Sequence, residues 1–297
     1  MKPAPLDGLL ILDKPGGITS RAALDRTARW FPDGTRVGHT GTLDPLATGV
    51  LVLCLGVATR LAEYVQRMHK TYRTTLLLGS RSDTDDADGT ITSVPGAPVP
   101  ELRAVQQRLA EFVGEIEQVP PAYSAAKVSG RRSYNLAREG EEVSLTARRV
   151  RIDGIDVLGY AYPRLELEVR CGKGTYIRAL ARDLGERLGC GALVEMLRRT
   201  AVGPFTAADA VTLEADAATA RARLLPVAAA VQGLWRVNLE AKEATRLRQG
   251  QSVPLGRLVR EAHGDEAAVF DSAGKLVAVA GVDYARGLLR PDKVLPP

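Results

Sequence analysis

The stretch from Gly38 to Leu61 constrains this chain more than any other, because it joins a glycine-rich polar loop directly to an apolar strand. It reads GHTGTLDPLATGVLVLCLGVATRL. The apolar, β-branched run over 50–55 predicts a buried strand that anchors the loop before it. Gly38, Gly41 and Gly49 predict turns that need a positive φ or the close approach of another molecule. The loop therefore holds its polar groups in fixed positions, as a ligand site requires.

One carboxylate, Asp44, stands in this loop, and no other acid occurs in the sequence between Asp33 and Glu63. It therefore has no neighbouring carboxylate in sequence to share acid and base roles. An isolated, ionised Asp suits a nucleophile, a member of an ion pair or a cap on a turn. Asp before Pro45 is a common start of a turn, so the local chemistry alone favours the cap.

The run His39-Thr-Gly-Thr-Leu-Asp-Pro-Leu-Ala-Thr-Gly-Val-Leu51 resembles the signature of the TruB family of tRNA pseudouridine synthases. Four more blocks in the first 205 residues resemble motifs of that family in the same order. The resemblance implies an α+β catalytic domain with a large mixed, mostly antiparallel sheet. It also implies isomerisation of uridine to pseudouridine at position 55, in the T-loop of tRNA, with the target base flipped out and without a cofactor.

The resemblance also implies roles for individual residues. Asp44 would be the nucleophile, Arg178 of Gly-Thr-Tyr-Ile-Arg would pair with it, and Tyr72 of Lys-x-Tyr would stack on the base. Because the reaction removes a proton from carbon, we also expect Tyr72 to take part in proton transfer. The residues expected to bind substrate or to support its site are His39, which would fill the space left by the flipped base, Lys14 of Leu-Asp-Lys-Pro, Arg60, Lys127 of Pro-x-x-Ser-Ala-x-Lys, Tyr176, and Leu197 of Leu-x-Arg-Thr.

The residue patterns alone leave other interpretations open for three of these side chains. A strand tyrosine such as Tyr72 commonly packs in a core. Arg178, in the first turn of a predicted helix, is mildly disfavoured by the helix dipole, so either a carboxylate or phosphate compensates it or the side chain is exposed. A lone histidine such as His39 is commonly a hydrogen-bonded structural residue.

Hydrophobic periodicity predicts the other elements of the first 232 residues. We expect strands over 9–12, 70–79, 147–160 and 165–171. We expect helices from a cap at Thr19 or Ser20 through Trp30, over 59–68, over 101–113, from a cap at Thr175 onward, and in the alanine-rich segment 207–231.

Four aspartates gather in the segment 80–90, which invites comparison with a calcium-binding loop. The register does not fit: with Asp83 at position one, Ala87 falls at position five and Val94 takes the place of the closing Glu. We therefore predict a solvated loop and no metal site.

From Gly233 the composition changes to short β-type runs separated by turns, which predicts a small barrel. This segment resembles a PUA domain, an RNA-binding module. We expect domains over 1–232 and 233–297, joined at a boundary that buries little shared core.

Composition narrows the class of protein. The chain has 297 residues, of which 45% are hydrophobic and 25% charged, so it can bury a core and form two domains. A net charge of +5 favours a polyanionic partner. The run Gly172-Lys173-Gly174 lacks the spacing of a phosphate-binding loop, which excludes a nucleoside triphosphate site of that type.

Cys54, Cys171 and Cys190 lie far apart, so neither a zinc ribbon nor a disulfide framework is indicated. Free thiols suit a reducing cytoplasm. The N-terminus has no signal-peptide pattern, and no run is long enough to span a membrane. We expect a cytoplasmic protein that binds the T-arm of tRNA and requires no obligate protein partner.

Two other functions remain open at this level. A non-catalytic tRNA-binding or tRNA-folding factor would need the basic residues and the C-terminal module but not Asp44. A base-excising glycosylase would also flip a nucleotide and use a carboxylate. Release of free uracil would distinguish it from a synthase.

Overall fold

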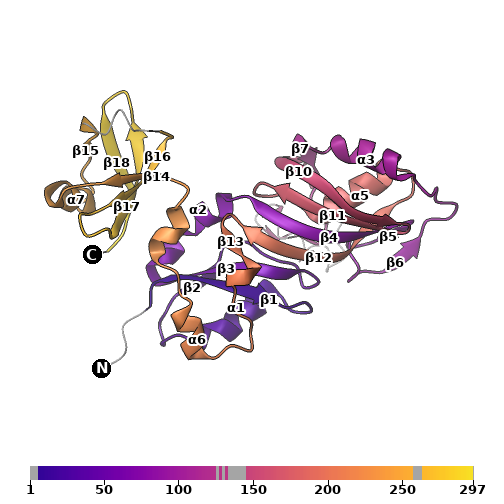
Figure 1. The fold of residues 1–297 in the computed structure, drawn as a ribbon, viewed down its shortest axis with the longest axis horizontal. Coiled ribbons are helices and arrows are strands. Elements are labelled where there is room, and N and C mark those ends of the chain that lie inside the picture. The colour runs from indigo at the N-terminus through magenta and orange to yellow at the C-terminus, as the bar shows by residue number, and fades with distance from the viewer. Residues whose placement is uncertain (1–5, 125–126, 129–130, 133–144, 257–262, 297) are drawn as a thin grey trace.

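This computed structural model describes residues 6–124, 127–128, 131–132, 145–256 and 263–296. Within them, nine strands form one large sheet and five form a second sheet, in a smaller C-terminal lobe at one end of the molecule (Figure 1). The strands of the large sheet are β1 (Gly8–Lys14), β2 (Val37–His39), β3 (Thr48–Leu55), β4 (Lys70–Leu78), β7 (Gly114–Gln118), β10 (Arg148–Ala161), β11 (Arg164–Cys171), β12 (Ala192–Val202) and β13 (Phe205–Thr206).

The strand order is β1-β3-β12-β4-β11-β10-β7, with β2 paired to β3 and β13 to β12. Among these described pairs, β3 and β12 run parallel and the others antiparallel, which confirms the predicted α+β class with a mixed, mostly antiparallel sheet. The predicted strands over 9–12 and 50–55 are also confirmed. They are buried on both faces, which explains their continuous apolar runs.

Gly49 lies where β3 meets β12 and has the predicted positive φ. Its φ is +100°, and a Cβ atom there would lie 2.2 Å from the carbonyl oxygen of Arg199. Only glycine fits without a shift of one strand. Gly38 and Gly41 have no positive φ, so for them only the predicted approach of another molecule stays a prediction.

Helices α3 and α5 cover one face of the β4, β11, β10 part of the sheet (Figure 1). None of the helices in the described ranges is long and apolar enough to cross a membrane. The α-helices are α1 (Ser20–Ala28), α2 (Ala62–Arg67), α3 (Leu102–Ala110), α5 (Ile177–Arg187), α6 (Ala217–Ala222) and α7 (Ala241–Arg248), and the 3-10 helices are η1 (Gly56–Leu61), η2 (Ala207–Asp209) and η3 (Val227–Val231).

Two helix predictions are wrong in detail. Thr175 does not cap α5: its hydroxyl donates to the carbonyl of Gly172, and Tyr176 is the N-cap residue. The segment 207–231 is not one helix but η2, α6 and η3 joined by turns and short bridged segments. Backbone pairing of Val211 and Leu225 with β1 interrupts the helix that alanine favours.

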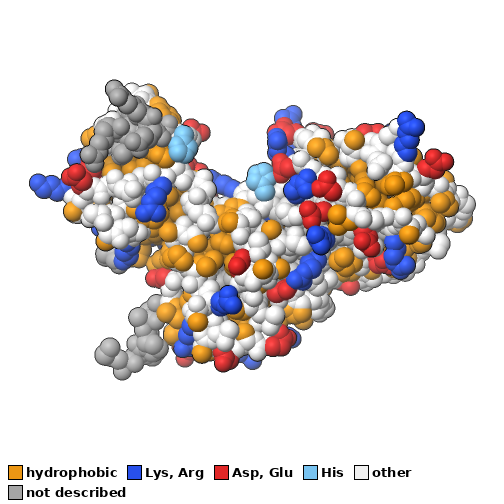
Figure 2. Space-filling model, in the orientation of Figure 1, with side chains coloured by type: hydrophobic (Ala, Val, Ile, Leu, Met, Phe, Trp, Pro, Cys, Tyr) orange, Lys and Arg blue, Asp and Glu red, His pale blue; other side chains and the backbone are white. Residues whose placement is uncertain are grey.

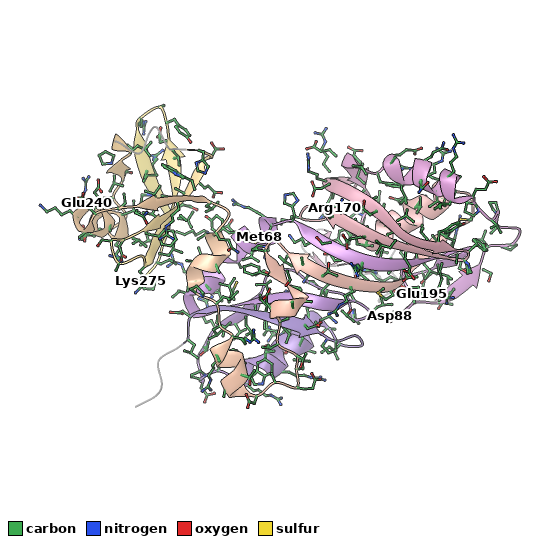
Figure 3. All side chains as sticks on the ribbon, in the orientation of Figure 1. Met68, Asp88, Arg170, Glu195, Glu240 and Lys275 are labelled. Carbon is green, nitrogen blue, oxygen red and sulfur yellow. The ribbon has the colours of Figure 1, made fainter. Side chains whose placement is uncertain are left out.

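The outer face of the large sheet carries paired charges. Figure 2 shows Lys and Arg side chains mixed with Asp and Glu over this part of the molecule. Arg164 holds Glu195 with two hydrogen bonds of 2.7 Å, and Arg170 pairs with Asp156 on the neighbouring strand; Figure 3 labels Arg170 and Glu195. Cross-strand pairs of this kind support the sheet. This face is therefore largely neutralised.

The C-terminal lobe consists of a five-stranded sheet with helix α7 packed on it, in the order β14-β16-β17-β18-β15. Outside this lobe, two further pairs of short strands form: β8 (Lys127–Val128) pairs with β9 (Arg131–Arg132), and β5 (Ser80–Ser82) pairs with β6 (Ile91–Ser93). The strands of the lobe are β14 (Trp235–Asn238), β15 (Val253–Pro254), β16 (Glu266–Phe270), β17 (Leu276–Asp283) and β18 (Leu288–Val294).

The expectation of little shared core at residue 233 is wrong. Phe270 and Val279 of the lobe belong to one buried cluster with Leu61, Tyr64 and Val231 of the larger part. The lobe has a second cluster of its own. One face of its small sheet therefore packs on the region of η1, α2 and η3, and this contact fixes the lobe to the rest of the molecule.

Candidate active site

A pocket of about 290 Å³ opens beside the parallel pair β3 and β12. Its walls come from the loop over 40–44, from β4, from β12 and from the segment 172–178 that leads into α5. We call it the Asp44 pocket. The predicted site residues that line it are Asp44, Tyr72, Tyr176, Arg178 and Leu197.

The loop that carries Asp44 is fixed from inside the protein by Ser20, the first residue of α1. The Ser20 hydroxyl accepts from the amide of Leu43 at 2.7 Å and donates to its carbonyl at 2.8 Å. The turn itself closes through the backbone, from the amide of Ala47 to the carbonyl of Asp44. The Asp44 side chain is thus available for another partner, and Arg178 supplies the ion pair described below.

Two buried cations hold the same loop on either side of Asp44. Arg199 Nη2 donates to the carbonyl of Gly41 at 3.0 Å, and Lys14 Nζ lies 3.4 Å from the carbonyl of Pro45. Burial lowers the pKa of Lys14 to about 8, although the charge of Asp44 opposes this shift. A loop held at three points presents its carboxylate in one position.

Arg178 joins two carboxylates. Its Nη2 lies 2.9 Å from Asp44 Oδ2, and its Nη1 lies 3.2 Å from Asp86 Oδ2. The side chains of Arg178 and Asp86 are each 5% exposed, whereas that of Asp44 is 36% exposed and faces the pocket. The same two nitrogens also donate to the carbonyls of Tyr123 and Thr84, each at 2.8 Å. The guanidinium is therefore fixed in orientation as well as in position.

Asp86 contradicts the prediction of a solvated loop over 80–90. It is buried, burial raises its pKa, and its Oδ1 accepts from the amide of Asp88, which Figure 3 labels. The preceding Asp85 pairs with Arg182 at 3.1 Å. Arg178 and Arg182 lie four residues apart, so they share one face of α5, and they pair with the consecutive aspartates Asp86 and Asp85. This spacing is the signal in the sequence that could have indicated these two aspartates as partners of the helix.

Tyr72 lies on β4, directly across from Arg199 on β12. Burial raises the pKa of its hydroxyl, while the Arg199 guanidinium opposes that shift. Lys70, on the same strand and also lining the pocket, donates to the carbonyls of Gln66 and Met68 at 2.5 Å. Burial lowers the pKa of Lys70 to about 8. The pocket thus combines one carboxylate with an aromatic ring and several cations.

Comparison with known protein families shows the family to which this chain belongs. A family model described as the TruB family pseudouridylate synthase N-terminal domain matches residues 29–177, and one described as the tRNA pseudouridylate synthase B C-terminal domain matches 178–232. The chain belongs to the TruB family. It is therefore an enzyme of the isomerase class.

Similar curated proteins cover almost the whole chain. The tRNA pseudouridine synthase B of Burkholderia mallei is 44% identical over 98% of this chain and 97% of its own length. That of Chromohalobacter salexigens is 47% identical over 84% of this chain and 83% of its own. A solved structure of a Cbf5–Nop10–Gar1 complex superposes with a TM-score of 0.74 at 26% identity, over 98% of this chain and 85% of the other. The TruB fold thus extends through the C-terminal lobe.

Tyr176 and Leu197 form further walls of the Asp44 pocket. Tyr176 is fixed by two hydrogen bonds from its backbone to Gln118, a buried residue of β7 that the sequence analysis did not single out. Gln118 Oε1 accepts from the Tyr176 amide at 2.8 Å, and Gln118 Nε2 donates to the Tyr176 carbonyl at 3.0 Å. Leu197 lies on β12, two residues before Arg199. Because alternate residues of a strand share a face, Leu197 and Arg199 both reach the pocket.

Of the remaining residues expected at the site, His39, Arg60 and Lys14 do not line the pocket, although Lys14 lies in the loop-supporting position expected of it. His39 ends β2 and Arg60 is exposed on η1, and neither lines the pocket. Lys14 supports the loop from behind rather than lining the cavity. Lys127 begins β8, and its side chain lies outside the described residues.

Proposed function

We propose that this protein converts uridine to pseudouridine at position 55, in the T-loop of tRNA, with Asp44 as the nucleophile. The observation that carries the proposal is the partly exposed Asp44 carboxylate, fixed 2.9 Å from a buried guanidinium at the wall of the pocket. Relatives of similar length are named tRNA pseudouridine synthase B. Family, pocket chemistry and relatives support the same reaction.

The reaction requires a detached base to be held while it turns. Uracil leaves ribose at N1, rotates and rejoins through C5. A carboxylate can form the covalent intermediate that divides this change into two easier steps. Entry of the base excludes water from Asp44, and the fixed guanidinium of Arg178, 2.9 Å away, remains as its partner under those conditions.

Asp86 would act through Arg178. It occupies one side of the guanidinium and so limits its rotation, leaving the other side for Asp44. A single positive charge then faces two carboxylates. This leaves Asp44 less completely neutralised than in a simple pair, which favours its reactivity as a nucleophile.

Tyr72 is suited to two tasks. Its ring can stack on the flipped base, which is worth about 1–3 kcal/mol and offsets part of the cost of flipping. Its hydroxyl oxygen can take the proton that C5 must lose once C5 has joined the ribose. Tyr176 and Leu197 would complete the walls around the base, and His39 would occupy the space it leaves in the T-loop.

The C-terminal segment 233–297 would serve as a PUA-like RNA-binding domain on the catalytic domain 1–232. Exposed cations such as Lys242 and Lys275 are available for phosphate contacts there, and Arg60 is available near the junction. The three cysteines are free and buried, which suits work in the reducing cytoplasm, where tRNA is found.

An unmodified tRNA transcript tests the proposal. Incubation with the full chain, followed by carbodiimide-based mapping, should reveal pseudouridine at position 55 and at no other position in the T-arm. A short T-arm stem-loop should also be a substrate, since the pocket residues come from the larger part of the molecule. Conversion at a different position would refute the T-loop assignment, and release of free uracil would indicate a glycosylase.

A non-catalytic tRNA-folding factor is less well supported. Burying a charge network such as Arg178 with Asp86 and Asp44 gains little stability compared with apolar packing. A binding protein has no use for such a network in a pocket. Equal stimulation of tRNA folding by the wild type and by Asp44→Asn, without any pseudouridine, would favour that alternative.

A further inference from the structure

Two arginines are buried in the described part of the chain, and they differ in their partners. Arg178 faces two carboxylates, whereas Arg199, which is 3% exposed, forms no ion pair with any described carboxylate. Moving a cation out of water is costly unless hydrogen bonds or an anion compensate it. Arg199 therefore needs an explanation that the ion-pair network does not supply.

Backbone carbonyls satisfy only part of the Arg199 guanidinium. Its Nε donates to Val50 at 2.7 Å and its Nη2 donates to Gly41 at 3.0 Å. These bonds fix its plane between β3 and the loop that carries Asp44. The third nitrogen, Nη1, remains for the pocket, and the residue directly across on β4 is Tyr72.

Three described groups act electrostatically on the Tyr72 hydroxyl, one in one direction and two in the other. Arg199, from β12, favours the ionised form through its charge and through hydrogen bonding. Cys171, from β11, and Asp44, from the loop, favour the neutral form, as does burial. Arg199 is the one among these influences that would stabilise a phenolate.

We infer that Arg199 is a positioning residue that acts through Tyr72: it holds the phenol in the pocket and stabilises the phenolate that accepts the proton from C5 of the base. The inference rests on the proposed function. In this step the C5–H bond breaks and an O–H bond forms on Tyr72. The electron pair forms the C5=C6 double bond while the N1=C6 double bond opens and N1 takes up a proton. Tyr72 gives its own proton to solvent before this step and N1 takes its proton from solvent, so the protons balance and no further reagent is needed.

The first test measures Tyr72 in the free protein. Tyrosine labelled with ¹³C at Cζ reports ionisation by its NMR shift. Arg199→Gln should raise the pKa of Tyr72 by about 1–3 pH units, the usual effect of removing a neighbouring opposite charge. Arg199→Lys retains the charge and should restore most of the wild-type titration. The matched control is Arg198→Gln, on the opposite face of β12, where Arg198 pairs with Asp13 at 2.6 Å. An unchanged titration in Arg199→Gln would overturn the inference.

The second test separates this role from simple support of the loop. Single-turnover conversion by Arg199→Gln should fall by about 100-fold, as for loss of one preorganised donor, and its alkaline pH dependence should shift upward. In a Tyr72→Phe background the same substitution should have almost no further effect. Multiplicative losses in the double variant would show that Arg199 acts on the loop and not through Tyr72.

Different results would refute the proposed function and the inferred role of Arg199. If the wild type makes no pseudouridine, the proposed function is wrong, yet the NMR titration still decides whether Arg199 controls Tyr72. If the wild type is active and Arg199→Gln folds but turns over normally, the inference alone is wrong. Should Arg199→Gln not fold, Arg199→Lys serves instead: wild-type turnover in Arg199→Lys, with a Tyr72 pKa well above that of the wild type, would overturn the inference equally.

Discussion

The Asp44 pocket and the C-terminal lobe use charge in opposite ways. In the pocket, Arg178 and Asp86 are almost inaccessible to solvent and several hydrogen bonds fix them. Where the lobe meets the rest of the molecule, the pair Arg67 with Glu266 is shorter, at 2.6 Å against 3.2 Å for Arg178 with Asp86, but its side chains are 49% and 31% exposed. Solvent can replace the second kind of pair, whereas it cannot reach the first.

This difference indicates where function depends on geometry and where it depends on summed charge. A substitution that changes the shape of one member disrupts a buried network, because water cannot reach the site to replace the lost hydrogen bonds and ion pairs. An exposed pair contributes little, and its loss is absorbed by solvent and salt. Substitutions in the pocket should therefore have large and specific effects, and those at the lobe small and general ones.

The largest effect is expected for Asp44→Asn. The amide is nearly isosteric but cannot act as the nucleophile, so conversion should become undetectable. Affinity for tRNA should stay within a few-fold of wild type, because phosphate contacts dominate binding. Pseudouridine mapping and filter binding on the same preparation check both statements. Substantial turnover would end the assignment of Asp44 as nucleophile.

Tyr72→Phe should retain binding but lower turnover by about 100-fold to 10,000-fold, the usual contribution of a general acid or base. Tyr72→Leu should lose stacking as well, and with it binding of the flipped base. Single-turnover kinetics separate the two variants. Near wild-type turnover by the Phe variant would leave only the stacking role, and the same result for Leu would remove Tyr72 from the site.

Arg178→Lys keeps the charge but cannot face two carboxylates with one planar group, so turnover should fall by about 100-fold. The matched control is Arg182→Lys, one turn further along α5, where Arg182 pairs with Asp85 outside the pocket. It should lose much less activity. Equal losses in both variants would mean that anchoring of the 80–90 loop, and not orientation of Asp44, is what matters.

Lys70 provides a test by pH. Its folded-state pKa of about 8 lies below the usual 10.5, so between these values the unfolded chain binds a proton that the folded chain has lost. Lys70 should therefore make the free energy of unfolding rise with pH across this window, by at most roughly 1.4 kcal/mol for each pH unit, and Lys14, whose pKa is also about 8, adds to this rise. Lys70→Met should make the rise in the free energy of unfolding, measured by urea from about pH 8 to 10, less steep, whereas Lys275→Met, exposed on the lobe, should not. The same curve for wild type and Lys70→Met would contradict this.

The smallest effect is expected for Glu266→Gln. Loss of its exposed pair with Arg67 should change the free energy of unfolding by less than about 1 kcal/mol and leave conversion unaltered. Urea unfolding and pseudouridine mapping measure these quantities. A destabilisation above about 2 kcal/mol would show that the junction depends on this pair more than on the shared apolar cluster, and the contrast with the pocket would fail.

Much of the site was predictable because its chemistry lies in short runs. The loop around Asp44, the strand tyrosine at 72 and the arginine at 178 each stand in a short motif that resembles the TruB family, and that resemblance, rather than the local chemistry alone, indicated the site. Ser20, Asp86, Gln118 and Arg199 were missed as site residues, since their importance depends on partners distant in sequence. Ser20 holds Leu43 across 23 residues and Gln118 holds Tyr176 across 58.

The sequence by itself determined the buried strands around 9–12 and 50–55 and the position of a single carboxylate at the end of a glycine-rich loop, while the α+β class came from the resemblance to the family. Periodicity and turn chemistry act over a few residues, so they can be read locally. The tertiary structure alone decided that Asp86 shares Arg178 with Asp44 and that Arg199 faces Tyr72. Those pairs follow from strand order and register, in which β12 lies between β3 and β4, and no local pattern encodes that placement.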